Sequence, residues 1–115
     1  MRYALFALLL LGAAPATAAP AHQSARLGQT VRVGALAVRP IAVIEDSRCP
    51  RYVSCVWRGR LRLSAMVGHS RTMLDDGVPL AVRGGHLTLV EVTPVSGRGE
   101  KVPPDSYRFK FRFER

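Results

Sequence analysis

Apolar and polar residues alternate along most of this chain, and this alternation constrains its fold more than any other feature. In the segment 107–114, aromatic residues occupy every second position and charged residues lie between them. A period of two places successive side chains on opposite faces of a β-strand, whereas an amphipathic helix requires a period of about 3.6. Since no helical period follows residue 18, the sequence predicts an all-β fold.

Turn residues separate the alternating segments at regular intervals. Asp75-Asp76-Gly77 and Gly84-Gly85 are typical of short hairpin turns. The expected strands are 29–36, 38–45, 56–67, 71–74, 78–82, 87–95 and 107–114. This number and spacing predict a single antiparallel β-sandwich of about seven strands, immunoglobulin-like in character.

The segment 56–67 is expected to be the longest strand. Trp57 shares one face with Leu61 and Leu63, so we expect the indole to be buried in the sheet interior, and a platform for a ligand is the alternative. Gly59 lies within the same strand and indicates a β-bulge or a close approach of another backbone segment. Pro40, in the strand 38–45, predicts an edge position or a bend.

Residues 1–18 have the pattern of a secretory signal peptide. Arg2 supplies the positive charge, and the apolar stretch 4–14 is far shorter than the roughly 20 residues of a transmembrane helix. Small residues place the cleavage after Ala18 or after Ala21. We therefore expect a periplasmic or secreted protein with no transmembrane segment in the mature chain.

The mature chain is expected to form one domain. Residues 19–26 contain Pro20 and small or polar side chains, which predict a flexible N-terminal arm. The β-sandwich is expected to span residues 27–115, a length that suits one small domain.

The chain contains two cysteines, Cys49 and Cys55. In an oxidising compartment, this spacing predicts a disulfide that closes a short loop. The spacing is not the Cys-x-x-Cys of thioredoxin-like redox centres. Three scattered histidines add too few ligands for zinc, so neither a metal nor a cofactor is expected.

The segment around this disulfide also has a recognisable pattern. It reads Glu-Asp-Ser-Arg-Cys-Pro-x-x-Val-x-Cys-Val-Trp-x-Gly and resembles the signature of a family of small exported bacterial proteins with no established activity. The matching positions are Asp46, Ser47, Arg48, Cys49, Pro50, Val53, Cys55, Trp57, Gly59 and, at the start of the last strand, Tyr107. The resemblance covers roughly residues 27–113 and implies a β-sandwich with a disulfide-closed loop.

The signature residues support two interpretations. Arg48 lies two residues from Asp46, a spacing that allows a planar two-point ion pair to order the loop. The alternative is a recognition surface, formed by Asp46, Ser47, Arg48, Arg51 and Tyr52. A constrained loop that presents Arg51 could also lie in the cleft of a trypsin-like protease, which gives an inhibitor hypothesis.

The chain is strongly basic, with a formal net charge of +9. If the strands 56–67 and 107–114 lie in one sheet, their outward cations form a basic face. These cations are Arg58, Arg60, Arg62, Arg108, Lys110 and Arg112. Such a face suits an anionic polymer or lipid of the envelope. Nucleic acid is not expected, because the aromatic residues of the last strand point the other way. A composition biased towards arginine is the other explanation.

The sequence contains none of the catalytic motifs that we sought. It has no Gly-x-Ser-x-Gly, His-Glu-x-x-His or phosphate-binding glycine loop. We therefore expect a non-enzymatic binding domain that recognises an envelope protein or anionic envelope component through the Cys49–Cys55 loop or the basic face. A protease inhibitor that uses Arg51 is the alternative, and a small enzyme ranks third.

Overall fold

The computed structural model of the chain describes residues 12, 21–49, 54–57, 59–95 and 101–115. The predicted signal peptide, apart from Gly12, lies outside the described residues, so it stays a prediction. Within the described ranges, no helix has the length and apolar character needed to cross a membrane.

Eight strands and one 3-10 turn lie within the described residues. They are β1 (His22–Ala25), β2 (Val31–Val33), β3 (Leu36–Asp46), β4 (Leu61–Val67), β5 (Ser70–Asp75), β6 (Leu80–Val82), β7 (Gly85–Thr93), η1 (Pro104–Ser106) and β8 (Arg108–Glu114). Seven of the strands correspond to the segments in which the sequence alternates, and β1 is the addition.

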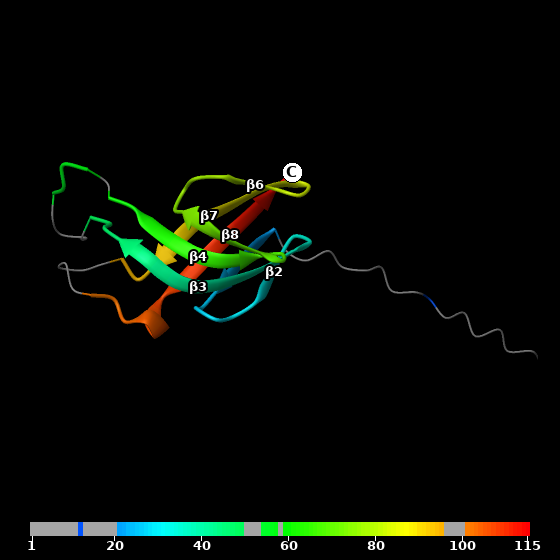
Figure 1. Cartoon of the computed structure of the whole chain (residues 1–115), viewed down its shortest axis with the longest axis horizontal. Helices are drawn as coiled ribbons and strands as arrows, with labels where there is room; N and C mark the ends of the chain where they lie inside the picture. Colours follow the sequence, from blue (N-terminus) through cyan, green and yellow to red (C-terminus); the bar gives the residue numbers. More distant parts are fainter. Residues whose placement is uncertain (1–11, 13–20, 50–53, 58, 96–100) are drawn as a thin grey trace, which may run out of the picture.

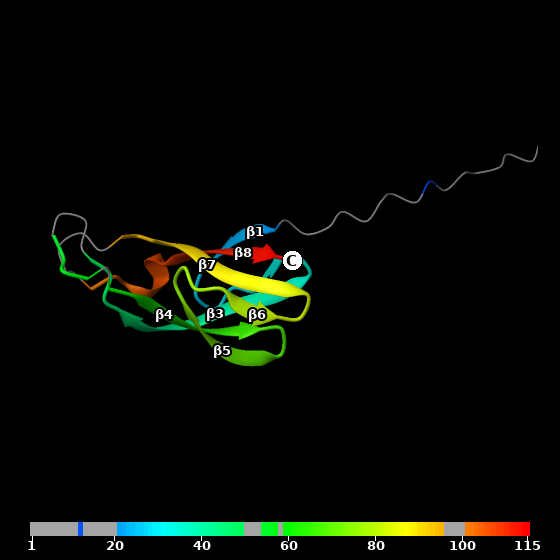
Figure 2. The same cartoon turned by 90° about the horizontal axis from the view of Figure 1, so that it is seen from above.

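The strands form two antiparallel sheets that face each other (Figures 1 and 2). One sheet has the order β1-β8-β7-β6 and the other has the order β2-β3-β4-β5. The predicted all-β sandwich is confirmed. Its strand order is mostly a meander of consecutive hairpins, whereas immunoglobulin domains have Greek-key connections.

Alternation explains the core between the sheets. The inward residues of β8, Phe109 and Phe111, are fully buried, and Leu61 and Leu63 of β4 are fully buried on the facing sheet. Burial of each such side chain stabilises the fold by about 1.5–3 kcal/mol relative to an exposed position. The remaining buried apolar residues are Ala25, Val33, Val38, Ala65, Val67, Leu74, Leu87, Leu89, Val92 and Tyr107.

The predicted flexible arm is wrong for residues 22–25, which form β1. This strand pairs with β8, where Ala25 lies opposite Phe109 and His22 lies opposite Arg112. The Ala25 side chain is only 1% exposed. The hydrogen bonds that order β1 come from the open edge of β8, a partner that the local sequence does not reveal.

Strand β3 bends next to Pro40, the residue at which the sequence predicts an edge position or a bend. The register between β3 and β4 shifts between Pro40 and Ala42 and again between Val43 and Glu45. Pro40 cannot donate a backbone hydrogen bond, but its carbonyl accepts one from Gly28 N at 2.7 Å. The bent strand then carries its last residue, Asp46, to one end of the sandwich.

The two ends of the sandwich carry different connections between strands (Figures 1 and 2). At the first, called here the disulfide end, β3 ends, β4 begins, and the described part of the connection from β7 to β8 is found. At the second, called here the turn end, lie the β2–β3 and β6–β7 hairpin turns and residue 115. The signature residues converge at the disulfide end.

Candidate binding site at the disulfide end

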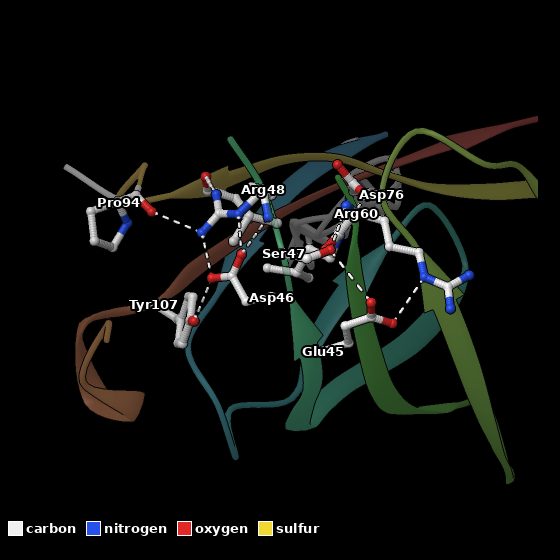
Figure 3. A network of polar contacts seen from close by, with 10 residues as sticks. Glu45, Asp46, Ser47, Arg48, Arg60, Asp76, Pro94 and Tyr107 are labelled. Carbon is white, nitrogen blue, oxygen red and sulfur yellow. Dashed lines mark hydrogen bonds and ion pairs between the residues drawn. The ribbon is translucent and has the colours of Figure 1, made fainter. Parts of the chain in front are cut away.

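Arg48 and Asp46 form the two-point ion pair that their spacing predicts (Figure 3). Arg48 Nε donates to Asp46 Oδ1 at 2.8 Å, and Arg48 Nη2 donates to Oδ2 at 2.9 Å. The Arg48 and Asp46 side chains are 12% and 15% exposed. Paired and largely shielded charges of this kind hold a defined geometry, unlike ion pairs in open solvent.

The Arg48 guanidinium also connects the two sheets. Its Nη1 donates to the Val92 carbonyl at 2.9 Å, and its Nη2 donates to the Pro94 carbonyl at 3.0 Å. Val92 lies near the end of β7, so one side chain joins the segment after β3 to the opposite sheet. We call Asp46, Arg48 and Tyr107 the anchor cluster.

Tyr107 completes the anchor cluster from the start of β8. Its hydroxyl donates to Asp46 Oδ2 at 2.7 Å, and the residue is only 5% exposed. Its ring stacks on Phe109, with centroids 5.5 Å apart. The alternation predicts that Tyr107 is buried, but its hydrogen bond to Asp46 joins residues that are 61 positions apart.

The protonation of each group follows from these contacts. Burial alone raises the pKa of Asp46, but the hydrogen bonds from Arg48 and Tyr107 and the charge of Arg48 outweigh it, so the pKa lies below the ordinary 3.8. The hydrogen bond to Asp46 raises the pKa of Arg48. Burial, together with the bond to Asp46, raises the pKa of Tyr107 to about 12. The cluster is therefore an ion pair with a neutral phenol at neutral pH.

A second set of contacts closes the base of the loop. Ser47 N donates to the Arg60 carbonyl at 2.9 Å, and Arg60 N donates to Ser47 Oγ at 3.1 Å. The Arg60 side chain pairs with Glu45, through Nε and Oε2, at 2.9 Å. These contacts extend the pairing of the two strands past the end of β3 and ahead of the start of β4.

Gly59 confirms the predicted close approach. Its φ is +66°, and an added Cβ would overlap the Ser47 carbonyl. A side chain at position 59 would therefore be excluded by its backbone conformation and by the opposing backbone.

Two aspartates at the end of β5 contact the first residues of β4. Asp76 Oδ1 accepts from Leu61 N at 2.9 Å, and Asp75 pairs with Arg62 at 2.8 Å. Within the described residues, no group of three or more His, Cys, Asp or Glu side chains is placed to hold a metal ion. These aspartates order the start of β4.

The disulfide between Cys49 and Cys55 is present, as predicted. The prediction that Trp57 is buried is wrong. Trp57 is 81% exposed and the preceding Val56 is 94% exposed. The reason is that β4 begins only at Leu61, so the alternation that places Trp57 on the inner face starts before the sheet does.

The predicted recognition residues have different outcomes. Ser47 contributes to the base of the loop, while Asp46 and Arg48 bind each other rather than face outwards. Arg51 and Tyr52, and with them the inhibitor hypothesis, lie outside the described residues. The sequence does not predict that Val56 is exposed, and it gives an exposed Trp57 only as the alternative to a core position.

The predicted basic face does not form one patch. Arg60 and Arg62 belong to or precede β4, whereas Arg108, Lys110 and Arg112 belong to β8, in the other sheet. The outward faces of two packed sheets point in opposite directions, so the condition for a joint patch is not met. Arg58 lies outside the described residues.

Several of these cations also have acidic partners. Arg60 pairs with Glu45, Arg62 with Asp75, and Arg112 with Glu114, with distances between 2.8 and 2.9 Å. Paired cations attract an anionic polymer less strongly than free ones, which further weakens the case for a single basic face.

Comparisons with family models, curated proteins and solved structures give no match for this chain. The resemblance to a family of exported bacterial proteins therefore stays a prediction.

Proposed function

We propose that this chain is an exported, non-enzymatic binding domain that recognises a protein partner of the bacterial envelope through Val56 and Trp57. The single observation that carries the proposal is the exposure of these two adjacent apolar side chains, at 94% and 81%. Tryptophan is enriched among the residues that dominate the free energy of protein–protein binding. An indole left in water costs hydration free energy that burial against a partner recovers.

The way in which this segment is held supports the proposal. Cys55 precedes Val56 and is bonded to Cys49 by the disulfide. Arg48, the residue before Cys49, belongs to the anchor cluster and donates a hydrogen bond to Val92 of β7. Gly59 then fixes the chain after Trp57 against Ser47. Fixing a binding segment before it meets its partner lowers the conformational entropy lost on association.

Export is supported by the same disulfide, since disulfides persist in oxidising compartments. The anchor cluster supports a structural rather than catalytic use of its polar groups, because the Asp46 carboxylate accepts hydrogen bonds from both Arg48 and Tyr107. A protein partner is favoured over an anionic polymer because the exposed pair is apolar.

The experiment compares the wild type with Trp57→Ala. Each tagged protein captures partners from a native envelope extract, and the captured proteins are quantified by mass spectrometry. The affinity for the purified partner is then measured by titration. We expect Trp57→Ala to weaken binding by about 30-fold, the equivalent of a hot spot of about 2 kcal/mol.

Met73→Ala provides the matched control. Met73 is a large apolar side chain that is 50% exposed on β5, where it lies opposite Ser64 in the middle of β4, so its removal should leave the affinity unchanged. The unfolding free energy of Trp57→Ala should match the wild type within about 0.5 kcal/mol, because an exposed side chain is replaced. Equal capture of every partner by the wild type and Trp57→Ala would refute the proposal.

A further inference from the structure

A cavity of about 680 Å³ opens at the turn end of the sandwich. Its lining residues come from the N-terminal side of β1, the β2–β3 and β6–β7 turns, and the end of β8. They are Ala21, Gly34, Ala35, Arg83, Gly84, Phe113 and Arg115. This volume lies within the range of about 300–1,000 Å³ that is typical of small-molecule sites.

An aromatic ring and two glycine turns shape this cavity. Phe113 follows the inward positions of β8 but is only partly buried, because the core ends there. Gly34 has φ +62°, and an added Cβ would lie 2.8 Å from Phe113 Cδ1. Gly84, in the other turn, has φ +86° and open space around it. Gly34 therefore packs directly against the ring, where a side chain would not fit, and Gly84 adds no side chain to the cavity lining.

The charged side chains in the lining are all of one sign. Arg83 and Arg115 are exposed, and neither forms an ion pair within the described part of the chain. Among the described residues, the arginines with acidic partners are Arg48, Arg60, Arg62 and Arg112. Two unpaired guanidinium groups beside an apolar surface attract an anion, and guanidinium binds a carboxylate or phosphate through two hydrogen bonds.

Two other crevices are comparable in size. One of about 560 Å³ contains Arg26 and Arg108 in its lining, but no aromatic ring lines it, and Arg108 Nη1 already donates to the carbonyls of Asp105 and Tyr107. The other measures about 540 Å³ and lies between β3 and the segment 101–107, where Glu45 and Asp46 contribute carboxylates and Lys101 contributes a cation. Carboxylates therefore outnumber cations in the lining of the 540 Å³ crevice. The turn-end cavity combines an aromatic ring with two guanidinium groups and no acidic side chain, which favours it as the anion site.

We propose that the turn-end cavity binds an anionic sugar, with the ring of the sugar on Phe113 and its carboxylate or phosphate between Arg83 and Arg115. A pyranose ring has one apolar C–H face, which suits an aromatic surface, while its anionic substituent suits the two guanidinium groups. The site is independent of the protein-binding role proposed for Trp57, since it uses different residues at the other end of the sandwich.

The test is a titration of the full mature protein, followed by heteronuclear NMR. The probes are an oligogalacturonate, glucose 6-phosphate and a neutral maltooligosaccharide. We expect one or both anionic probes to shift the backbone resonances of Gly34, Gly84 and Phe113, while the neutral probe does not. The two anionic probes distinguish a carboxylated sugar from a phosphorylated one.

Arginine variants decide whether the site is specific. Arg83→Gln and Arg115→Gln should each weaken binding by about tenfold, since each removes one charge-assisted contact. Arg71→Gln is the matched control, because Arg71 is exposed on β5 outside the cavity and its loss changes the net charge equally. The proposal is overturned if neither anionic probe binds, if the neutral probe binds equally, or if all three variants weaken binding alike.

Discussion

Replacement of Arg48 by alanine is the most direct test of how the disulfide end is held. The change removes two hydrogen bonds to Asp46 and one each to the carbonyls of Val92 and Pro94. It leaves the Asp46 carboxylate, whose side chain is 15% exposed, with the Tyr107 hydroxyl as its remaining side-chain partner in the anchor cluster. The folded state then contains a shielded charge without its counter-charge.

The magnitude follows from this burial. Removing one partner of a fully buried pair costs about 3–5 kcal/mol, while an exposed pair contributes about 0.2–1 kcal/mol. Because both side chains keep a little access to water, we expect a loss near the lower limit of the buried case, about 3 kcal/mol. For a domain of this length, that corresponds to a fall of about 12–24 °C in Tm.

Arg60→Ala provides the matched control for this measurement. Arg60 also pairs with an acidic residue of β3, Glu45, but these two side chains are 52% and 40% exposed. Its replacement should therefore cost less than about 1 kcal/mol. Urea unfolding followed by far-UV circular dichroism suits both variants, because the exposed Trp57 is a poor fluorescence reporter of the core. An equal loss in both variants, or a loss below about 1 kcal/mol for Arg48→Ala, would refute the reasoning.

Two further predictions concern Tyr107 and Gly59. The pKa of Tyr107 is raised from 10.0 to about 12 in the folded state, so its contribution is complete below about pH 10 and is lost as the pH rises towards 12. Urea unfolding at increasing pH should show a stability loss of about 2–3 kcal/mol over this interval, and Tyr107→Phe should lack this component; an unchanged alkaline loss in Tyr107→Phe would contradict the assignment. Gly59→Ala should cost more than about 2 kcal/mol, since the alanine meets both an unfavourable φ and the Ser47 carbonyl. Gly77→Ala, at φ +74° with open space around it, should cost only about 1–2 kcal/mol, and equal urea midpoints for the two variants would show that the overlap at Ser47 is unimportant.

The sequence predicts the interior of the sandwich well because alternation is a local property. Phe109 and Phe111 are buried as their spacing requires, and the two-residue separation of Asp46 and Arg48 is enough to predict their ion pair. The disulfide follows from the only two cysteines in the chain. In each case, the spacing of residues along the chain is enough to predict the contact that the structure shows.

Features that depend on distant partners are not visible in the same way. The strand β1 is ordered by the edge of β8, and alternation does not say which sheet a strand joins, so Arg62 and Arg112 were grouped on one face. Trp57 has the spacing of a core residue but precedes the first residue of β4. Its exposure depends on where pairing with β3 ends, which is a tertiary property.

Contacts at two positions near Trp57 bear on how the proposed binding segment is held. Gly59 packs against Ser47, and Arg48 is bound to both Asp46 and β7. A flexible apolar segment would lose conformational entropy on binding, and this cost would cancel part of the free energy gained by burying the indole. If the anchor cluster serves binding in this way, Arg48→Ala should weaken partner affinity although the Arg48 side chain is only 12% exposed. Arg60→Ala, which leaves the anchor cluster intact, should not.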